Sequence, residues 1–392
     1  MKRFLEIVSL LIIMMILNGC WDRQEVNDLA IITGAAFDLK GEDQVEVTLQ
    51  MISLKRTTGQ SGGSSEGSPS MTMVQTGNGR TLMDAVTQIQ TRVPRKLFWA
   101  HCKVFIFGES FAKKDIGQVI DFSFRHPQPR SQSKLFTYKG RASDLLKLPP
   151  SFEYSSSEVF RELSQLNIVM NITFNDLLNM MRREGQAFIL PYFENQIVSS
   201  NDKPSSILDT SKSAIFHKNK MIGNLDKPAT EGIRWFIDNR FDSIKTVELK
   251  DMEEPVSFQV NHRKAKLTPK IENGEWSIKV DIAARSVIIM NNTNLALMNP
   301  KLLEKINEGL RDRIRKEIES SLLQAQHKLK LDVFGFAQAF NRKYPKQWEK
   351  NKRNWQELLP KVKVTLNIQS TISRTGLKTV PIAIPEEEVQ QK

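Results

Sequence analysis

The clearest pattern in the chain is a stripe of apolar residues at every fourth position in its last third. The stripe consists of Leu302, Ile306, Leu310, Ile314, Ile318 and Leu322. This spacing keeps the side chains on one face of an α-helix, and therefore predicts a long helix over about 300–330. Asn299 and Pro300 suit the cap and the first turn of that helix. Acidic and basic residues are mixed on its other faces, so we expect it to pack on a sheet rather than on a membrane.

Around this helix, apolar and polar residues alternate strictly, which is typical of strands with one buried face. The alternating apolar positions are Val256, Phe258 and Val260, then Trp276, Ile278, Val280 and Ile282, and finally Val362, Val364, Leu366 and Ile368. Asn273 and Gly274 separate two of these runs, and both tolerate the positive φ angles of a tight hairpin turn. The pattern predicts an antiparallel sheet covered by the long helix.

The first half of the chain predicts a hairpin followed by alternating helices and strands. Two apolar-rich runs, 29–39 and 45–54, flank a turn at Gly41. Thr81 and Asp84 have the spacing of a helix capping box, and the same spacing recurs at Thr173 and Asp176. Further strands are expected at 104–107, 134–138, 214–216 and 221–223, and further helices at 115–124, 156–166, 173–183, 231–238 and 333–342.

Two polar segments interrupt this pattern. Residues 57–80 are rich in Gly, Ser and Thr and predict a flexible loop, and residues 199–212 predict a linker. The expected fold class is α+β and multidomain, with three compact domains built from mostly antiparallel mixed sheets flanked by helices. The expected boundaries are 1–19 for a signal peptide, 20–200 for an N-terminal α/β domain, 201–265 for a small middle domain, 266–376 for a C-terminal α/β domain and 377–392 for a tail.

The first twenty residues predict export and lipid attachment. Lys2 and Arg3 precede the segment 4–17, in which 12 of 14 residues are apolar, as in a secretory signal. The segment ends Leu17-Asn18-Gly19-Cys20, which resembles a bacterial lipobox. We therefore expect cleavage between Gly19 and Cys20, with an S-diacylglycerol and an N-acyl group on Cys20. The alternative is an uncleaved signal anchor.

Charge and cysteine usage agree with an exported protein. The net charge is +12, and the basic residues are scattered along the chain. Outside the cytoplasm, anionic lipid or wall polymers are the expected counter-surface, and nucleic acid is not. Since Cys20 is expected to carry lipid, Cys102 has no disulfide partner. Its place in an apolar strand favours a packed thiol over a reactive one.

Motifs for catalysis or metal binding are missing from the sequence. There is no phosphate-binding glycine loop, HExxH helix or Gly-x-Ser-x-Gly elbow. Ser131 and Lys134 fit the Ser-x-x-Lys spacing of penicillin-recognising enzymes, but the companion motifs are absent. His101 and Cys102 are adjacent on a strand and point to opposite faces, so they cannot chelate one metal ion. We expect no enzyme, no metal and no cofactor other than the covalent lipid.

Several short stretches together resemble one family. They are Gly19-Cys20-Trp21-Asp22-Arg23, Thr81 to Ala85, Arg95 to His101, Phe107-Gly108-Glu109, Ala214 to Phe216, Met221 to Gly223, Glu231 to Trp235, Phe334 to Phe336, Tyr344-Pro345, Trp348, Trp355 and Arg374-Thr375-Gly376. With these the chain resembles the Ger(x)C lipoproteins, the C subunits of spore-germination nutrient receptors. The resemblance covers the mature chain to about residue 376.

The resemblance implies three compact α/β domains without known catalysis. It implies assembly with two polytopic membrane subunits, of the A and B types, on the outer face of the cytoplasmic membrane that becomes the inner membrane of the spore. Tyr344 and Pro345 are expected to stop a helix, and Trp348 and Trp355 to bury against the long helix. The alternatives are a solute-binding lipoprotein of a transporter and, further away, a cell-wall hydrolase.

Overall fold

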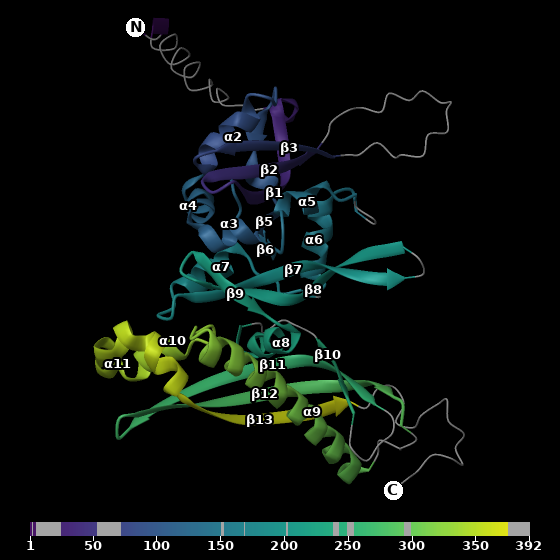
Figure 1. Ribbon diagram of the computed structural model, residues 1–392, viewed down its shortest axis with the longest axis vertical. Coiled ribbons are helices and arrows are strands. Elements are labelled where there is room, and N and C mark those ends of the chain that lie inside the picture. Colours follow the sequence, from purple (N-terminus) through teal and green to yellow (C-terminus); the bar gives the residue numbers. More distant parts are fainter. Residues whose placement is uncertain are drawn as a thin grey trace.

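Two β-sheets with their helices follow one another along the long axis of the molecule (Figure 1). The computed structural model describes residues 1, 3–4, 25–52, 72–149, 153–167, 169–200, 203–237, 243–248, 255–293 and 299–374. The predicted signal peptide 1–19, apart from three residues, and the predicted tail 377–392 lie outside this range. Mixed sheets flanked by helices confirm the predicted α+β class.

The larger sheet has nine strands in the order β3-β2-β1-β5-β6-β7-β8-β9, with β4 beside β1. Its strands are β1 (Leu29–Lys40), β2 (Gln44–Ile52), β3 (Thr72–Gly79), β4 (Lys96–Phe98), β5 (Val104–Gly108), β6 (Lys134–Tyr138), β7 (Ala187–Ser200), β8 (Lys203–His217) and β9 (Lys220–Leu225). Pairing is antiparallel at both ends and parallel from β1 through β5 and β6 to β7. Parallel strands are normally covered on both faces, and every residue of β5 is buried.

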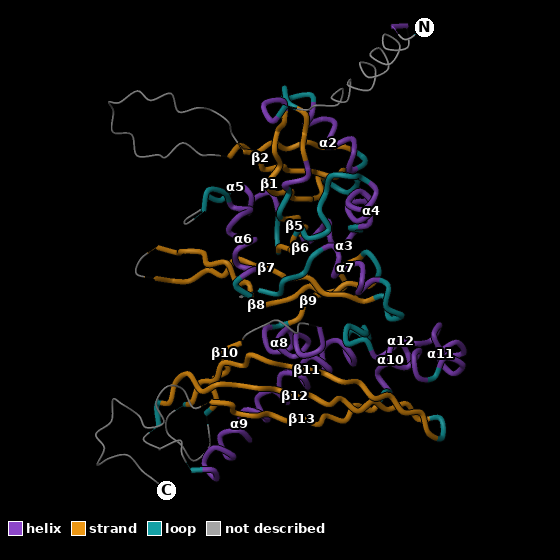
Figure 2. The backbone as a smooth tube through the Cα atoms, turned by 180° about the vertical axis from the view of Figure 1, so that it is seen from behind, coloured by secondary structure: helices purple, strands orange, loops and turns teal. Residues whose placement is uncertain are grey.

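Helices cover both faces of this parallel centre (Figure 2). On one face lie α2 (Leu82–Gln90), α3 (Glu109–Lys114), α4 (Gly117–Arg125) and α7 (Phe174–Met181), and on the other α5 (Ala142–Lys147) and α6 (Ser156–Gln165). Phe105 and Phe107 of β5 belong to the first core, whereas Val104 and Ile106 belong to the second. The continuous apolar run of β5 is thus explained by burial on both sides.

Local signals in this half are confirmed. β1 and β2 form the predicted antiparallel hairpin, with Gly41 at φ +66° in its turn. Both predicted capping boxes are present: the Thr81 hydroxyl accepts a hydrogen bond from Asp84 N, and that of Thr173 accepts one from Asp176 N.

Two predictions for polar segments are wrong where the structure describes them. The predicted loop 57–80 ends in strand β3, which pairs with β2; residues 53–71 are not described. The glycines that suggested a loop are required there, because a Cβ on Gly77 would lie 2.2 Å from the carbonyl oxygen of Ala85 in α2. The predicted linker 199–212 instead continues the β7–β8 hairpin, which extends beyond the helices (Figure 1).

The smaller sheet has the order β10-β11-β12-β13. Its strands are β10 (Ser243–Val247), β11 (Val256–Glu272), β12 (Glu275–Asn291) and β13 (Lys363–Arg374). Pairing is antiparallel except between β12 and β13, which run parallel. Asn273 and Gly274 adopt φ angles of 51° and 83°, as the hairpin prediction requires. One face of the sheet is buried, and no described helix packs on the other (Figure 2).

Five α-helices and a π-helical segment are described in this half. They are α8 (Lys227–Ile237), α9 (Pro300–Ser321), η3 (Leu322–Lys328), α10 (Phe336–Lys343) and α11 (Pro345–Asn351), with the short α12 (Trp355–Leu358) after them. The predicted stripe of α9 is buried, and α9 lies across the sheet as expected. Beyond Ser321 the predicted helix continues as a wider π-helical turn. Trp348 and Trp355 are buried as predicted, but their aromatic neighbours are each other, Trp276 and Phe340.

The residues expected to form a middle domain, 201–265, are shared between the two sheets. β8 and β9 belong to the larger sheet, β10 and the start of β11 belong to the smaller one, and α8 lies between them (Figure 1). One connected core contains buried residues of both sheets. Because this core does not separate the chain into units, the predicted domain boundaries stay predictions.

Helices α8 and α9 approach each other most closely at Gly232. A Cβ at this position would lie 2.0 Å from the carbonyl oxygen of Glu317 and 2.9 Å from the Cβ of Ser321. Since the first of these atoms belongs to the backbone of α9, no rotamer change relieves the clash. Glycine at this position is therefore a condition for the contact between the two helices.

We predict that Gly232→Ala destabilises the protein although alanine is the better helix former. Alanine gains about 1 kcal/mol of helix propensity, but the clash with α9 costs about 3 kcal/mol or more, so a net loss of about 2 kcal/mol is expected. Gly223→Ala is the control, because its Cβ would meet only Leu329 at 3.7 Å. Equal free energies of unfolding for the two variants in urea would contradict the close crossing.

Candidate functional site

The predicted lipidation and cleavage residues, Cys20 and Gly19, lie outside the described residues. The next described stretch begins at Glu25, continues through a 3₁₀ turn, η1 (Val26–Asp28), and enters β1 at Leu29. The expected attachment point is therefore nine residues before the first residue of the larger sheet, Leu29. In the part of the chain that is described, no helix is long and apolar enough to cross a membrane.

Cys102 is a packed residue, as predicted. Its side chain is 1% exposed, its Sγ lies 3.5 Å from the carbonyl oxygen of Val104, and burial raises the pKa of its thiol far above the ordinary value. The reactive form of cysteine is the thiolate, so this thiol is inert near neutral pH. The described residues contain no group of three His, Cys, Asp or Glu side chains that could hold a metal ion.

The most concentrated polar chemistry is a buried ion-pair cluster between α8, α9 and β10. The Lys245 ammonium lies 2.8 Å from Glu317 Oε1 and 2.7 Å from Glu231 Oε2. The side chains of Lys245 and Glu317 are only 5% and 3% exposed. The indole N–H of Trp235 donates to Glu317 Oε2 at 3.4 Å. The cluster holds α9 against α8 and β10, which lie far earlier in the sequence.

Two arginines extend the cluster. Arg234 lies 3.3 Å from Glu231 and donates to the carbonyl oxygen of Asn167, which follows α6 in the larger-sheet half. Arg263 of β11 stacks over the Trp235 ring at 4.5 Å and donates to the hydroxyl of Ser243. The cluster thereby joins both halves of the molecule.

The electrostatics of the cluster favour ionised Glu231. Burial by itself raises the pKa of Glu231, but the nearby charges of Lys245 and Arg234 lower it more, so that the pKa lies below its ordinary value. Buried charges are costly to desolvate, and they are tolerated only when each is paired. The side chains of Lys245 and Glu317 are buried and bonded to each other, so the cluster holds α9 against β10.

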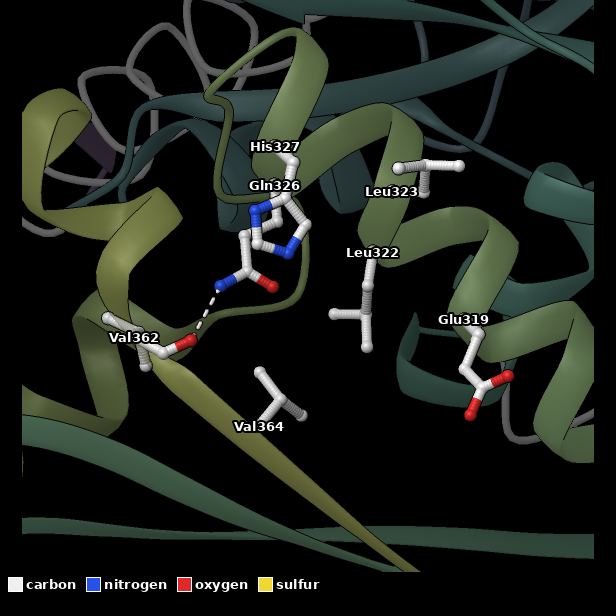
Figure 3. Close-up of a pocket in the computed structure, with 7 residues that line it drawn as sticks. All are labelled: Glu319, Leu322, Leu323, Gln326, His327, Val362 and Val364. Atoms are coloured by element: carbon white, nitrogen blue, oxygen red, sulfur yellow. Dashed lines mark hydrogen bonds between the residues drawn. The ribbon is translucent and has the colours of Figure 1, made fainter.

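A shallow groove lies at the surface, where the π-helical segment η3 meets the start of β13 (Figure 3). The residues that line this shallow groove of about 210 Å³ are Glu319, Leu322, Leu323, Gln326, His327, Val362 and Val364. Leu322 and Val362 are buried and form an apolar floor, whereas Leu323 is 52% exposed at the rim. Among helical segments, π-turns occur frequently at functional sites.

Gln326 is the buried polar group of this groove. Its amide nitrogen donates to the carbonyl oxygens of Leu359 and Val362 at 2.8 and 2.9 Å, and the second of these bonds is drawn in Figure 3. Its carbonyl oxygen Oε1 is buried and has no hydrogen-bond partner within the described residues. The groove is smaller than the 300–1,000 Å³ typical of small-molecule pockets, and its size suits one or two side chains of a protein partner.

Two larger hollows are open to solvent. One, of about 380 Å³, lies between α2 and α4 and has the Asp121–Arg125 ion pair at its edge. The other, of about 430 Å³, lies beside the smaller sheet and is lined by residues including Lys270, Lys279 and Tyr344. In both, the charged groups Asp121, Arg125, Lys270 and Lys279 are paired within the chain.

Sequence reasoning did not find the buried cluster or the groove. Glu231 and Trp235 were singled out only as part of a resemblance. Lys245 occupies an inward position of an alternating strand, between buried Ser243 and Val247, and a charged residue at such a position is a signal that could have been used. The π-helical turn has no recognised sequence signal.

Comparisons with known proteins agree with this fold. A family model described as "Spore germination protein N-terminal domain" matches residues 22–195, and one described as "Spore germination B3/ GerAC like, C-terminal" matches residues 211–376. Spore germination protein KC of Bacillus subtilis is 28% identical over 399 residues, which cover 97% of this chain and 98% of the relative. Spore germination protein B3 of the same organism is 22% identical, with 96% and 99% covered.

A solved structure titled "Crystal Structure of the GerBC protein" has the same fold. It superposes with a TM-score of 0.56 at 17% sequence identity, covering 87% of this chain and 97% of that one. The fold and the two matched regions define a spore germination protein. The chain belongs to the Ger(x)C family, the C subunits of germinant receptors.

We predict that Glu317→Gln destabilises the protein strongly. The substitution leaves the buried Lys245 with one carboxylate in place of two, and breaking a buried ion pair costs about 3 kcal/mol or more. Glu319→Gln, two residues further along the same helix and exposed, is the control and should change stability by about 0.5 kcal/mol or less. Urea unfolding curves of both variants test this. A Glu317→Gln variant as stable as the control would show that the cluster contributes nothing.

Proposed function

We propose that this protein is a non-enzymatic, lipid-anchored subunit of a nutrient germinant receptor, required for spores to germinate in response to nutrients. The observation that carries the proposal is the pair of spore germination family models, which together match residues 22–195 and 211–376. The buried state of Cys102 and the buried ion pair of Lys245 with Glu317 support a structural role for the polar groups that the fold brings together.

Attachment to the membrane by lipid on Cys20 is supported by the sequence. The basic head at Lys2 and Arg3, the apolar segment 4–17 and the Gly19-Cys20 pair have the order that a lipoprotein signal requires. Two or more acyl chains give a stable anchor, since each buried methylene contributes about 0.8 kcal/mol. The proposed place is the outer face of the cytoplasmic membrane, which becomes the inner membrane of the spore.

The proposed mode of action is protein contact within a complex. The proposed partners are two polytopic subunits, of the A and B types, that span the membrane and are better placed to transmit a signal across it. Lipid on Cys20 confines this protein to the same plane, which raises the effective concentration for a weak interface. The small groove beside Gln326 has the size for partner side chains.

The second candidate is a solute-binding lipoprotein of a transporter. Such a protein requires a pocket for its solute, and the two larger hollows between α2 and α4 and beside the smaller sheet are the places to look. The two halves of this chain differ in strand number and order, whereas solute-binding lipoproteins are commonly built from two similar lobes. The architecture therefore favours the receptor subunit.

We predict that lipid attachment depends on Cys20 alone. A Cys20→Ala strain fed a radioactive fatty acid should show no label on this protein, and the protein should be retained as an unprocessed precursor or released. Cys102→Ser is the matched control and should be labelled as strongly as the wild type, because Cys102 is buried in the fold. Equal labelling of wild type and Cys20→Ala would refute the anchor.

We predict that the protein is required for its own receptor but does not bind the nutrient itself. Deleting the gene should abolish germination with that receptor's nutrient and leave the responses of other receptors in the same spores intact. The purified lipoprotein in detergent should give no heat of binding with millimolar nutrient, yet should co-purify with the two membrane subunits. A tight and specific nutrient affinity of the isolated protein would instead establish the solute-binding alternative.

A further inference from the structure

The distance between the expected lipid and the folded protein is short. Glu25 is the fifth residue after Cys20, and an extended chain spans at most about 3.6 Å per residue, so Glu25 lies within about 18 Å of the acylated cysteine. This step rests on the proposed lipid anchor. Residue Glu25 is followed by η1, which leads into β1. The end of the larger sheet at which β1 starts therefore lies close to the membrane surface.

Strand β4 lies directly beside the start of β1. The two strands run parallel, with Leu29 opposite Lys96 and Ile31 opposite Phe98. The connection from α2 to β4 carries Arg92 and Arg95 and leads into β4 at Lys96. In Figure 1, α2 and strands β1 to β3 lie at one end of the long axis, and the smaller sheet lies at the other.

The backbone that carries these basic residues is held in place. The side-chain amide of Gln90 donates to the carbonyl oxygen of Arg95 at 2.8 Å and accepts a hydrogen bond from Leu97 N at 3.0 Å. A second basic loop is fixed beside it, because the Gln128 side chain accepts a hydrogen bond from Trp99 N at 3.0 Å. Arg130 follows in that loop. It lies close enough to His101 that its charge, after burial, helps to lower the histidine's pKa.

The charges at this end are unevenly balanced. Arg92, Arg95, Lys96 and Arg130 form no ion pair with any described residue; Arg92 donates only to the carbonyl oxygen of Thr76. Among the described residues just before β1, the acidic ones are Glu25 and Asp28, so these four basic side chains outnumber them. By contrast, the neighbouring Lys103 is paired with Glu158.

We propose that Arg92, Arg95, Lys96 and Arg130 form a membrane-facing surface that binds the anionic phospholipid headgroups of the bilayer in which Cys20 is anchored. The lipid supplies the attachment, and this surface sets the orientation. Each basic side chain at an anionic leaflet shifts the equilibrium toward the docked orientation about fivefold, the equivalent of about 1 kcal/mol. The long axis then points away from the membrane, and the smaller sheet with the groove beside Gln326 is held away from the bilayer surface.

The test uses the lipidated protein reconstituted in vesicles of phosphatidylcholine, with or without phosphatidylglycerol. A fluorophore is attached to Gln132→Cys, an exposed position two residues after Arg130, in a Cys102→Ser background. A lipid that carries a quencher on its headgroup reports how close this position lies to the membrane. Quenching should be strong with phosphatidylglycerol, weak without it, and weaker at high salt, because exposed charges are screened.

The charge variants decide the outcome. Lys96→Gln/Arg130→Gln should reduce the docked-to-undocked ratio about 25-fold, from about fivefold for each charge. Lys350→Gln/Arg353→Gln is the matched control: it removes the same charges from exposed positions in the half built on the smaller sheet and should leave quenching unchanged.

Flotation of the vesicles separates the two levels of the argument. If the protein fails to float with phosphatidylcholine vesicles, the lipid anchor is wrong and the membrane-facing surface falls with it. If the protein floats, but its quenching is the same with and without phosphatidylglycerol or in both charge variants, the anchor stands and the membrane-facing surface is refuted. The membrane-facing surface is supported if Lys96→Gln/Arg130→Gln reduces quenching and Lys350→Gln/Arg353→Gln does not.

Discussion

The architecture depends on the crossing of α8 and α9 at Gly232. Helix α8 follows directly on β9, the last strand of the larger sheet, while α9 covers the smaller sheet. The absence of a side chain at Gly232 lets the two helices touch along their backbones, and the Lys245–Glu317 ion pair lies beside the same crossing. Apolar contact brings the helices together without specifying a register, whereas a buried charge is tolerated only where its partner is within reach. The crossing therefore fixes one sheet relative to the other.

This fixed junction sets the position of one end of the molecule relative to the other, which matters for the proposed function. The expected lipid lies at the end where β1 starts, and the groove lined by η3 and β13 lies in the half built on the smaller sheet (Figure 1, Figure 3). If the halves could rotate freely, an anchor at one end would not position a docking groove at the other. Because Arg234 also bonds to the carbonyl oxygen of Asn167 in the larger-sheet half, the junction restrains rotation as well as separation. A rigid spacer between membrane and partner is the mechanical role that this architecture can serve.

Sequence reasoning succeeded where the information is local. The capping boxes at Thr81 and Thr173, the hairpin turn at Gly274 and the stripe on α9 all depend on residues within a few positions of one another. It failed where a distant neighbour decides. The glycines of β3 are typical of a loop in the sequence, but they are required because α2 packs directly against them. The role of Lys245 depends on Glu317, which is 72 positions away in the sequence. The predicted lipid site at Cys20 depends on local sequence, because a peptidase and an acyltransferase recognise a short stretch of chain.

The junction is also insensitive to pH in the range where most proteins work. The pKa of Glu231 is lowered in the folded protein, so its pairing with Lys245 and Arg234 contributes stability that is fully present above the ordinary carboxyl pKa of 4.5. That contribution is lost only as the pH falls from about 4.5 through the lower value of the folded state. A change near neutral pH therefore leaves the contribution of Glu231 to the junction in place, and this carboxylate cannot act as a switch between the two sheets in that range.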